Sequence, residues 1–167
     1  MTFFYEDVLV ALQDAEVRFV LVGGTAVILH GVPRTTADLD IVIDLEASNV
    51  RRLVEALTRL GFRPRAPVPA AELASAERRR EWIEAKGMRA FTFQRPGRVL
   101  DEVDVIIDTP LVFSDLVREA RVLEAGGLRL PIASPQHLIR MKEATGRDQD
   151  AADIDALRRL LEAESRE

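Results

Sequence analysis

Two aspartates separated by one residue, Asp38 and Asp40, give the sequence its clearest sign of chemistry. Both are expected to be carried by a strand, because the apolar segment LDIVIDL, residues 39–45, is short and rich in β-branched residues. Side chains alternate between the faces of a strand, so both carboxylates are expected on one face. Adjacent carboxylates repel each other, so the pair predicts a bound cation, either Mg²⁺ or Mn²⁺. The alternative is that both aspartates lie on a solvent-facing strand edge and bind no ion.

A third carboxylate would complete a two-metal site of the kind that clamps both oxygens of a phosphoryl displacement. The best candidate is Asp104, because it lies inside the apolar run VDVII, residues 103–107. Glu102 and Asp108 share its parity along the expected strand and remain alternatives if the register differs. Alternatively, Asp104 has no catalytic role and is a buried aspartate whose carboxylate is hydrogen-bonded by backbone amides or paired with an arginine.

A pair of glycines, Gly23 and Gly24, follows the apolar segment VRFVLV of residues 17–22 and precedes an expected short helix. Glycine allows a ligand to approach the backbone closely, and the start of a helix offers unpaired amides to a phosphate. Thr25 could add a hydroxyl group to this phosphate site. Glycines are common in strand-to-helix turns, so the two aspartates that follow give the motif its weight.

The elements that must position these residues alternate between strand and helix, which predicts an α/β (α+β) fold with a mixed sheet flanked by helices. Helices are predicted over residues 4–14, 25–30, 48–60, 70–86, 114–120, 134–146 and 148–163. Strands are predicted over residues 17–22, 39–45, 89–93 and 99–107, with a hairpin over 121–132. We expect a core over residues 1–133 and a helical C-terminal tail over 134–167, packed together as one compact unit.

Composition excludes several classes of protein. A net charge of −5 over 167 residues argues against binding nucleic acid by bulk attraction. The absence of cysteine removes thiolate catalysis, disulfides and cysteine-ligated zinc. No apolar run approaches the length of a membrane span, and the N-terminus lacks the basic start of a signal peptide, so a cytoplasmic protein with no membrane partner is expected.

The glycine pair, the aspartate pair and the later Asp104 together resemble the signature of the DNA polymerase β-like nucleotidyltransferase superfamily. The stretch LVGGTAVILHGVPRTTADLDIVI is similar to its minimal prokaryotic branch, which includes AbiEii-like toxins of abortive-infection and toxin–antitoxin systems. The late stretch KEATGRDQDAADIDAL, residues 142–157, resembles the end of such proteins. One departure is Gly24, where many members have a serine that contacts phosphate.

The resemblance implies a magnesium-dependent transfer of a nucleoside monophosphate from a nucleoside triphosphate to RNA, protein or a small molecule. It assigns Asp38 and Asp40 to metal binding, Asp104 to metal binding or general-base work, and the two glycines to the triphosphate. It also suggests that Lys142 reaches the triphosphate. Arg34, in the loop before the aspartate pair, could contact phosphate or the acceptor, or pair with Asp44.

An alternative function is that of a weakly catalytic or non-catalytic partner in a toxin–antitoxin or regulatory pair, bound to an antitoxin-type protein. The short tail leaves limited room for recognising an acceptor, which favours this second reading. Neither the acceptor nor the preferred base follows from the sequence.

Overall fold

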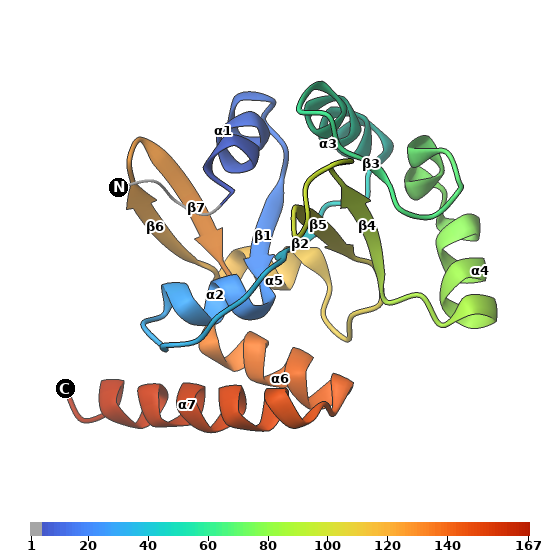
Figure 1. The fold of residues 1–167 in the computed structure, drawn as a ribbon. Helices are drawn as coiled ribbons and strands as arrows, with labels where there is room; N and C mark the ends of the chain where they lie inside the picture. Colours follow the sequence, from blue (N-terminus) through green and yellow to red (C-terminus); the bar gives the residue numbers. More distant parts are fainter. Residues whose placement is uncertain (1–4) are drawn as a thin grey trace.

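The sheet that carries the candidate residues is seen in a computed structural model that describes residues 5–167 (Figure 1). Its strands are β1 (Phe19–Val22), β2 (Leu39–Ile43), β3 (Arg63–Pro64), β4 (Ala90–Gln94), β5 (Glu102–Ile106), β6 (Arg121–Ala125) and β7 (Leu128–Ile132). They pair in the order β3-β4-β5-β2-β1-β7-β6. The sheet is mixed, because β2 runs parallel to β5 and β1 parallel to β7, while the remaining pairs are antiparallel. The predicted fold class, a mixed sheet flanked by helices, is confirmed.

Helices lie on both sides of this sheet. They are α1 (Glu6–Asp14), α2 (Gly23–Leu29), α3 (Ala47–Arg59), the 3₁₀ turn η1 (Ala70–Ala74), α4 (Ala76–Lys86), α5 (Phe113–Glu119), α6 (Pro135–Thr145) and α7 (Asp148–Glu164). In Figure 1, α1 and α3 lie above the strands, α4 lies at the right beside β4, and α2, α6 and α7 lie below. No helix within residues 5–167 is both long and apolar enough to span a bilayer.

The hydrophobic core combines buried residues of the central strands with buried residues of helices on both sides of the sheet, α1 and α3 on one and α2 and α6 on the other. All four residues of β1 are buried, as expected for a short apolar strand between two neighbours. Trp82 of α4 packs on Phe91 of β4 with ring centroids 5.3 Å apart, and Phe91 packs on Phe93 at 5.1 Å. These aromatic residues therefore belong to the core, which fixes β4 against α4.

Local signals explain several element boundaries. Ser134 accepts a hydrogen bond from the His137 amide, and Pro135 follows it, so α6 begins where the cap-then-proline pattern predicts. Gly146 ends α6 with a positive φ of 65°, a backbone conformation that favours glycine. The chain then turns into α7, which packs on α6, while α6 packs on α2.

Some predicted elements differ from those observed. The helix predicted over residues 70–86 is two elements, because Ser75 adopts an extended conformation and caps α4 by accepting a hydrogen bond from the Arg78 amide. Helix α3 begins at Ala47, one residue earlier than predicted, and Glu46 precedes it. The two-residue strand β3 has no sequence signal of its own. The start predicted for the first helix, Phe4, lies outside the described residues.

Candidate active site

The centre of the candidate site is the parallel pairing of β2 with β5. Asp40 lies directly opposite Asp104 in this pairing, flanked by the pairs Leu39–Val103 and Ile41–Val105. Both flanking pairs are fully buried, which locks the register of the two strands. Asp38 precedes β2 instead of lying within it, so the expectation that it shares the strand with Asp40 is wrong.

Burial and mutual repulsion raise the pKa values of the carboxyl groups around Asp40. Burial, and then the charges of Asp104 and Asp38, raise the pKa of Asp40 from 3.8 to about 7. Burial and the charge of Asp104 also raise the pKa of Asp38. A cation placed among these oxygen donors would relieve the repulsion, so the donor set fits a divalent metal ion chemically.

Asp104 is held from the neighbouring strand. The hydroxyl of Thr92, opposite it on β4, donates a hydrogen bond of 2.6 Å to one oxygen of its carboxylate. In this arrangement no three acidic or histidine side chains within residues 5–167 converge closely enough to hold an ion together. Sequence reasoning missed Thr92. Its polar side chain between Phe91 and Phe93 was the available signal, because strand parity separates it from the core face.

Neither of the two alternatives to Asp104 is paired with Asp40. The carboxylate of Glu102 pairs with Arg65, at the side of the sheet where β3 and β4 lie. Asp108 follows the end of β5, is exposed, and lines one cavity together with Asp40. The structure therefore places Asp104, and neither alternative, directly opposite Asp40.

The two glycines form the first residues of α2, so this helix begins two residues earlier than predicted. Gly23 has a φ of +64°, and a β-carbon added there would lie 1.9 Å from a carboxylate oxygen of Asp40. A β-carbon added at Gly24 would lie 2.8 Å from the Thr36 hydroxyl oxygen. Glycine is thus required at both positions by close packing, and at the first also by its backbone conformation.

Thr25 and Thr36 stabilise the loop that leads to β2. Both hydroxyls lie 3.4 Å from the carbonyl oxygen of Asp38, to which they donate long hydrogen bonds. Thr25 therefore contacts the same residue that the sequence assigns to metal binding. Its hydroxyl is already used by the protein in this structure.

A buried network of ion pairs joins this loop to the C-terminal helices. The Lys142 ammonium lies 2.8 Å from a carboxylate oxygen of Asp153 and 3.4 Å from one of Asp150. Arg34 also pairs with Asp153, so its predicted alternative partner, Asp44, is wrong. Both cations on this side of the site are thus neutralised by α7, whose aspartates do more than cap the helix.

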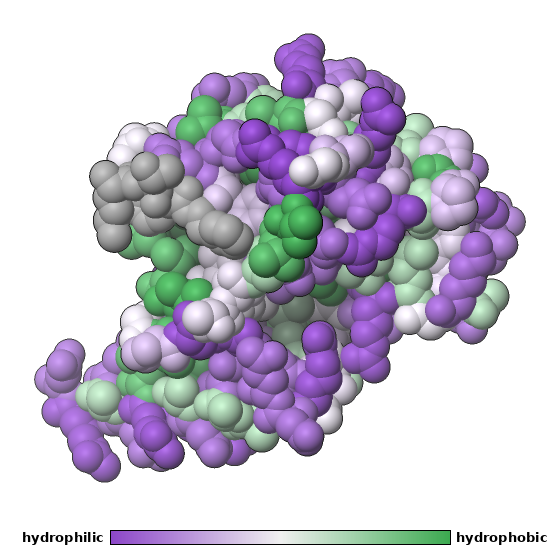
Figure 2. All heavy atoms as spheres, in the orientation of Figure 1, coloured by the Kyte–Doolittle hydropathy of each residue, from purple (hydrophilic) through white to green (hydrophobic). Residues whose placement is uncertain are grey.

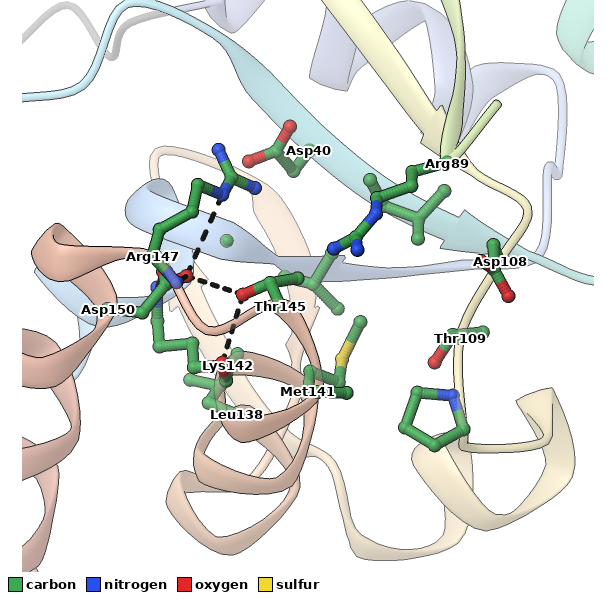
Figure 3. Close-up of a pocket in the computed structure, with 15 residues that line it drawn as sticks. Asp40, Arg89, Asp108, Thr109, Leu138, Met141, Lys142, Thr145, Arg147 and Asp150 are labelled. Atoms are coloured by element: carbon green, nitrogen blue, oxygen red, sulfur yellow. Dashed lines mark hydrogen bonds and ion pairs between the residues drawn. The ribbon is translucent and has the colours of Figure 1, made fainter. Parts of the chain in front are cut away.

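A third cation of the region, Arg147, is less tightly held. Its guanidinium lies 3.7 Å from the nearest oxygen of Asp150, and three quarters of its side chain is exposed. Figure 3 shows it between Asp150 and Asp40, on the side of the cavity opposite Arg89. The sequence does not single out Arg147, because its proximity to Asp40 depends on the turn between α6 and α7.

Two cavities meet at Asp40. The first, which we call the α6 cavity, has a volume of about 380 Å³ and an apolar floor of Leu138 and Met141 (Figure 3). The second, the loop cavity, has a volume of about 410 Å³ and is walled by residues 34–38. Both cavities are lined by Gly23, Asp40, Lys142, Arg147 and Asp150. In the space-filling view, the molecule is hollowed between the sheet and the C-terminal helices, and mainly hydrophilic residues surround the hollow (Figure 2).

A mixed sheet that sets paired aspartates beside a glycine turn defines a nucleotidyltransferase fold, and solved structures share it. A lincosamide antibiotic adenylyltransferase, LnuA, in its lincomycin-bound form superposes with a TM-score of 0.61 at 13% identity, covering 96% of this chain and 99% of that one. ANT(2")-Ia in complex with adenylyl-2"-tobramycin gives a TM-score of 0.55 at 14% identity over 95% and 88% of the two chains. An antigenic nucleotidyltransferase-like protein from Paracoccidioides brasiliensis gives 0.51 at 20% identity over 90% and 72%.

The chain belongs to the AbiEii family, described as nucleotidyl transferase AbiEii toxin of type IV toxin–antitoxin systems, whose model matches residues 7–143. The expected family is therefore confirmed. The match includes the glycine turn and all three aspartates, and it ends after Lys142, before α7. No curated protein sequence matches the chain significantly.

Proposed function

We propose that the chain transfers a nucleoside monophosphate from a nucleoside triphosphate to an acceptor hydroxyl, with a divalent cation as cofactor. The observation that carries this proposal is the pairing of Asp40 with Asp104. The backbone of Gly23 approaches the Asp40 side chain closely, and both of these residues line the two cavities. Membership of a nucleotidyltransferase family supports it. Because such a reaction consumes nucleoside triphosphate, we propose the cytoplasm as its location.

The cation would be Mg²⁺, or Mn²⁺ in its place, held by Asp38, Asp40 and Asp104. When bound, it supplies positive charge that stabilises the phosphates and the leaving pyrophosphate. The raised pKa values of Asp38 and Asp40 support this assignment, because the protein tolerates a repulsion that a cation would remove.

In the transfer step, an acceptor oxygen bonds to the α-phosphorus, and the bond from that phosphorus to the bridging oxygen breaks. Pyrophosphate leaves with the electron pair, and the acceptor hydroxyl proton passes to the Asp104 carboxylate. The hydrogen bond from Thr92 leaves the second oxygen of Asp104 available to take this proton. Asp104 is thus the group we assign as general base.

The two cavities divide the reactants. The loop cavity, which Gly24 and Arg34 line and which Thr25 follows in the chain, suits the triphosphate. Arg147 lines both cavities and is less tightly ion-paired than Lys142, so its guanidinium can bind phosphate. Lys142 would act mainly by holding α7 in place, because two aspartates already pair with it. The α6 cavity then remains for the acceptor, with Arg89 among the residues that line it.

The experiment that tests this function incubates the protein and each labelled nucleoside triphosphate with total RNA and total protein from the host, with and without Mg²⁺. Transfer of label to an acceptor should occur in the wild type and be lost in Asp40→Asn. Asp44→Asn is the matched control, because Asp44 lies just beyond the same strand and pairs with Arg18 away from the site. Label that never leaves the triphosphate under any condition would overturn the proposal.

A second candidate function is that of a partner in a toxin–antitoxin pair with little catalysis of its own. An apolar hollow of about 580 Å³ favours it, because Val117 of α5 and Val122 of β6 are about half exposed there. Coexpression with the product of the neighbouring gene would test it. A stable complex that forms without any transfer activity would support this function over the first.

A further inference from the structure

Tyr5 connects three segments that are far apart in the sequence. Its ring is buried, and its hydroxyl oxygen lies 2.8 Å from the carbonyl oxygen of Ala37 and 2.9 Å from that of Leu100. The amide of Glu102 donates a hydrogen bond of 2.8 Å to the same hydroxyl. A hydroxyl has one proton, so Tyr5 donates to one carbonyl at a time while it accepts from the amide.

These bonds lie at the entrance to both strands of the candidate site. Ala37 immediately precedes Asp38, and Glu102 lies two residues before Asp104. Direct pairing of β2 with β5 begins just beyond them, at Leu39 opposite Val103. The Tyr5 hydroxyl therefore joins an amide of one strand to a carbonyl that precedes the other.

The pairing that Tyr5 extends is short and carries a repulsive pair. Only three residue pairs are in register between β2 and β5, and the middle pair is Asp40 with Asp104. Like charges directly opposite each other destabilise a strand pair, so these strands are under a force that separates them. A bond at their entrance opposes that separation.

A second contact holds the same end of α1 to the β4–β5 turn. Arg95 pairs with Asp7 at 2.8 Å and with Asp101 at 3.0 Å. The start of α1 is therefore attached to the segment that leads into β5 by two independent contacts. Tyr5 is the one of them that also reaches the segment before β2.

We propose that Tyr5 is a positioning residue that sets the separation of the strands bearing Asp40 and Asp104, and so the affinity of their carboxylates for a divalent cation. This inference rests on the function proposed above. The residue touches neither substrate nor metal, and its hydroxyl acts through the backbone of the two strands. Groups that hold metal-binding residues in place without touching the metal typically change metal affinity by about tenfold or more when they are removed.

The test compares Tyr5→Phe with Gln13→Leu. Gln13 is the matched control, because it also lies in the α1 region and bonds to distant backbone groups, the Gly127 carbonyl and the Arg129 amide, away from the site. Binding of Mn²⁺ is followed by electron paramagnetic resonance in the presence of a non-hydrolysable nucleoside triphosphate. Thermal unfolding of each variant gives its loss of stability.

Tyr5→Phe should weaken Mn²⁺ binding by about tenfold, while Gln13→Leu should leave it within about twofold of the wild type even where both lower the melting temperature. Asp40→Asn separates the two proposals. If it abolishes binding and Tyr5→Phe does not weaken it, the role of Tyr5 is overturned and the proposed function stands. If the wild type binds no Mn²⁺, or Asp40→Asn binds it unchanged, both are overturned.

Fluorine labelling tests the role of Tyr5 without replacing it, so this test remains possible even if Tyr5→Phe fails to fold. Tyr5 is the only tyrosine of the chain, so growth with 3-fluorotyrosine places one fluorine beside this hydroxyl. Addition of Mg²⁺ and nucleotide should shift its resonance in the wild type and leave it unchanged in Asp40→Asn. A resonance that stays fixed in the wild type while Mn²⁺ binds would overturn the inference.

Discussion

Replacing Asp40 by asparagine should stabilise the metal-free protein at alkaline pH while it abolishes transfer. Asp40 carries a carboxyl whose pKa is raised to about 7, first by burial and then by the charges of Asp104 and Asp38. Ionising this group is therefore less favourable in the folded protein than in the unfolded chain. Asparagine has a similar size and no charge, so it avoids this cost.

The magnitude follows from the difference between the two states. Between pH 3.8 and about pH 7, the folded protein keeps a proton on Asp40 that the unfolded chain has lost. The folded state binds more protons in this window, so stability falls as pH rises through it. Full ionisation would cost about 4 kcal/mol at about 1.4 kcal/mol per pKa unit, and relaxation of the site reduces the expected gain to about 2–4 kcal/mol.

The assay is thermal unfolding of both proteins without divalent cations at pH 5 and at pH 8. A gain of this size corresponds to a melting temperature about 5–10 °C higher for Asp40→Asn at pH 8. At pH 5 the gain should be less than half as large, because pH 5 lies only about a third of the way through the window between pH 3.8 and about pH 7 over which stability falls. Mg²⁺ at pH 8 should then stabilise the wild type and not the variant, because only a folded site that binds the ion gains from it.

Asp44→Asn is the control for this experiment, because it removes a carboxylate from the end of the same strand without touching the cluster. It breaks the contact with Arg18 at 2.9 Å and should not raise the melting temperature at either pH. The reasoning would be refuted if Asp40→Asn melted at or below the wild-type temperature at pH 8. An equal gain at pH 5 and pH 8 would refute it as well.

Two further substitutions test the packing of the site. Gly23→Ala should displace Asp40 and abolish transfer, because the added β-carbon would lie 1.9 Å from the Asp40 carboxylate. The rate of label transfer measures this effect. Gly97→Ala is the control for positive-φ strain alone, since Gly97 has a positive φ and open space around it. Lys142→Met should destabilise the protein by about 3–5 kcal/mol in urea unfolding, because it leaves two buried aspartates without their lysine. Arg158→Met breaks an exposed ion pair and should cost less than about 1 kcal/mol.

Either substitution can contradict its explanation. If Gly23→Ala transfers label as well as Gly97→Ala does, the close approach of Gly23 to Asp40 has no functional role. If Lys142→Met and Arg158→Met lower the free energy of unfolding equally, the buried network does not hold α7 to the rest of the protein.

Much of the fold could be predicted because the signals were local. The hairpin over residues 121–132 follows from its two glycines, and α6 from Ser134 followed by Pro135. The break at Ser75 was missed because the helical pattern of residues 70–86 continues through it. Strand β3 was missed because two residues carry no periodicity, and their pairing depends on β4.

In the candidate site as well, the features with local signals could be predicted and those that depend on distant segments could not. Strand parity and apolar context singled out Asp40 and Asp104 from sequence. Asp38 was placed on the strand because the aspartates are two residues apart, yet regular pairing starts only at Leu39. Arg34 was assigned Asp44 as one possible partner, a choice guided by nearness in sequence, whereas its actual partner, Asp153, comes from the last helix.

The sequence by itself determined which residue types could do the chemistry and which strands would carry them, because side-chain alternation and turn formation are local properties. Tertiary structure alone decided that Asp104 stands opposite Asp40, that Thr92 and Tyr5 brace this pair, and that Lys142 is neutralised by α7. Each of these contacts joins segments whose separation is set by strand register and helix packing. Register and packing depend on the whole core, so no window of the sequence contains them.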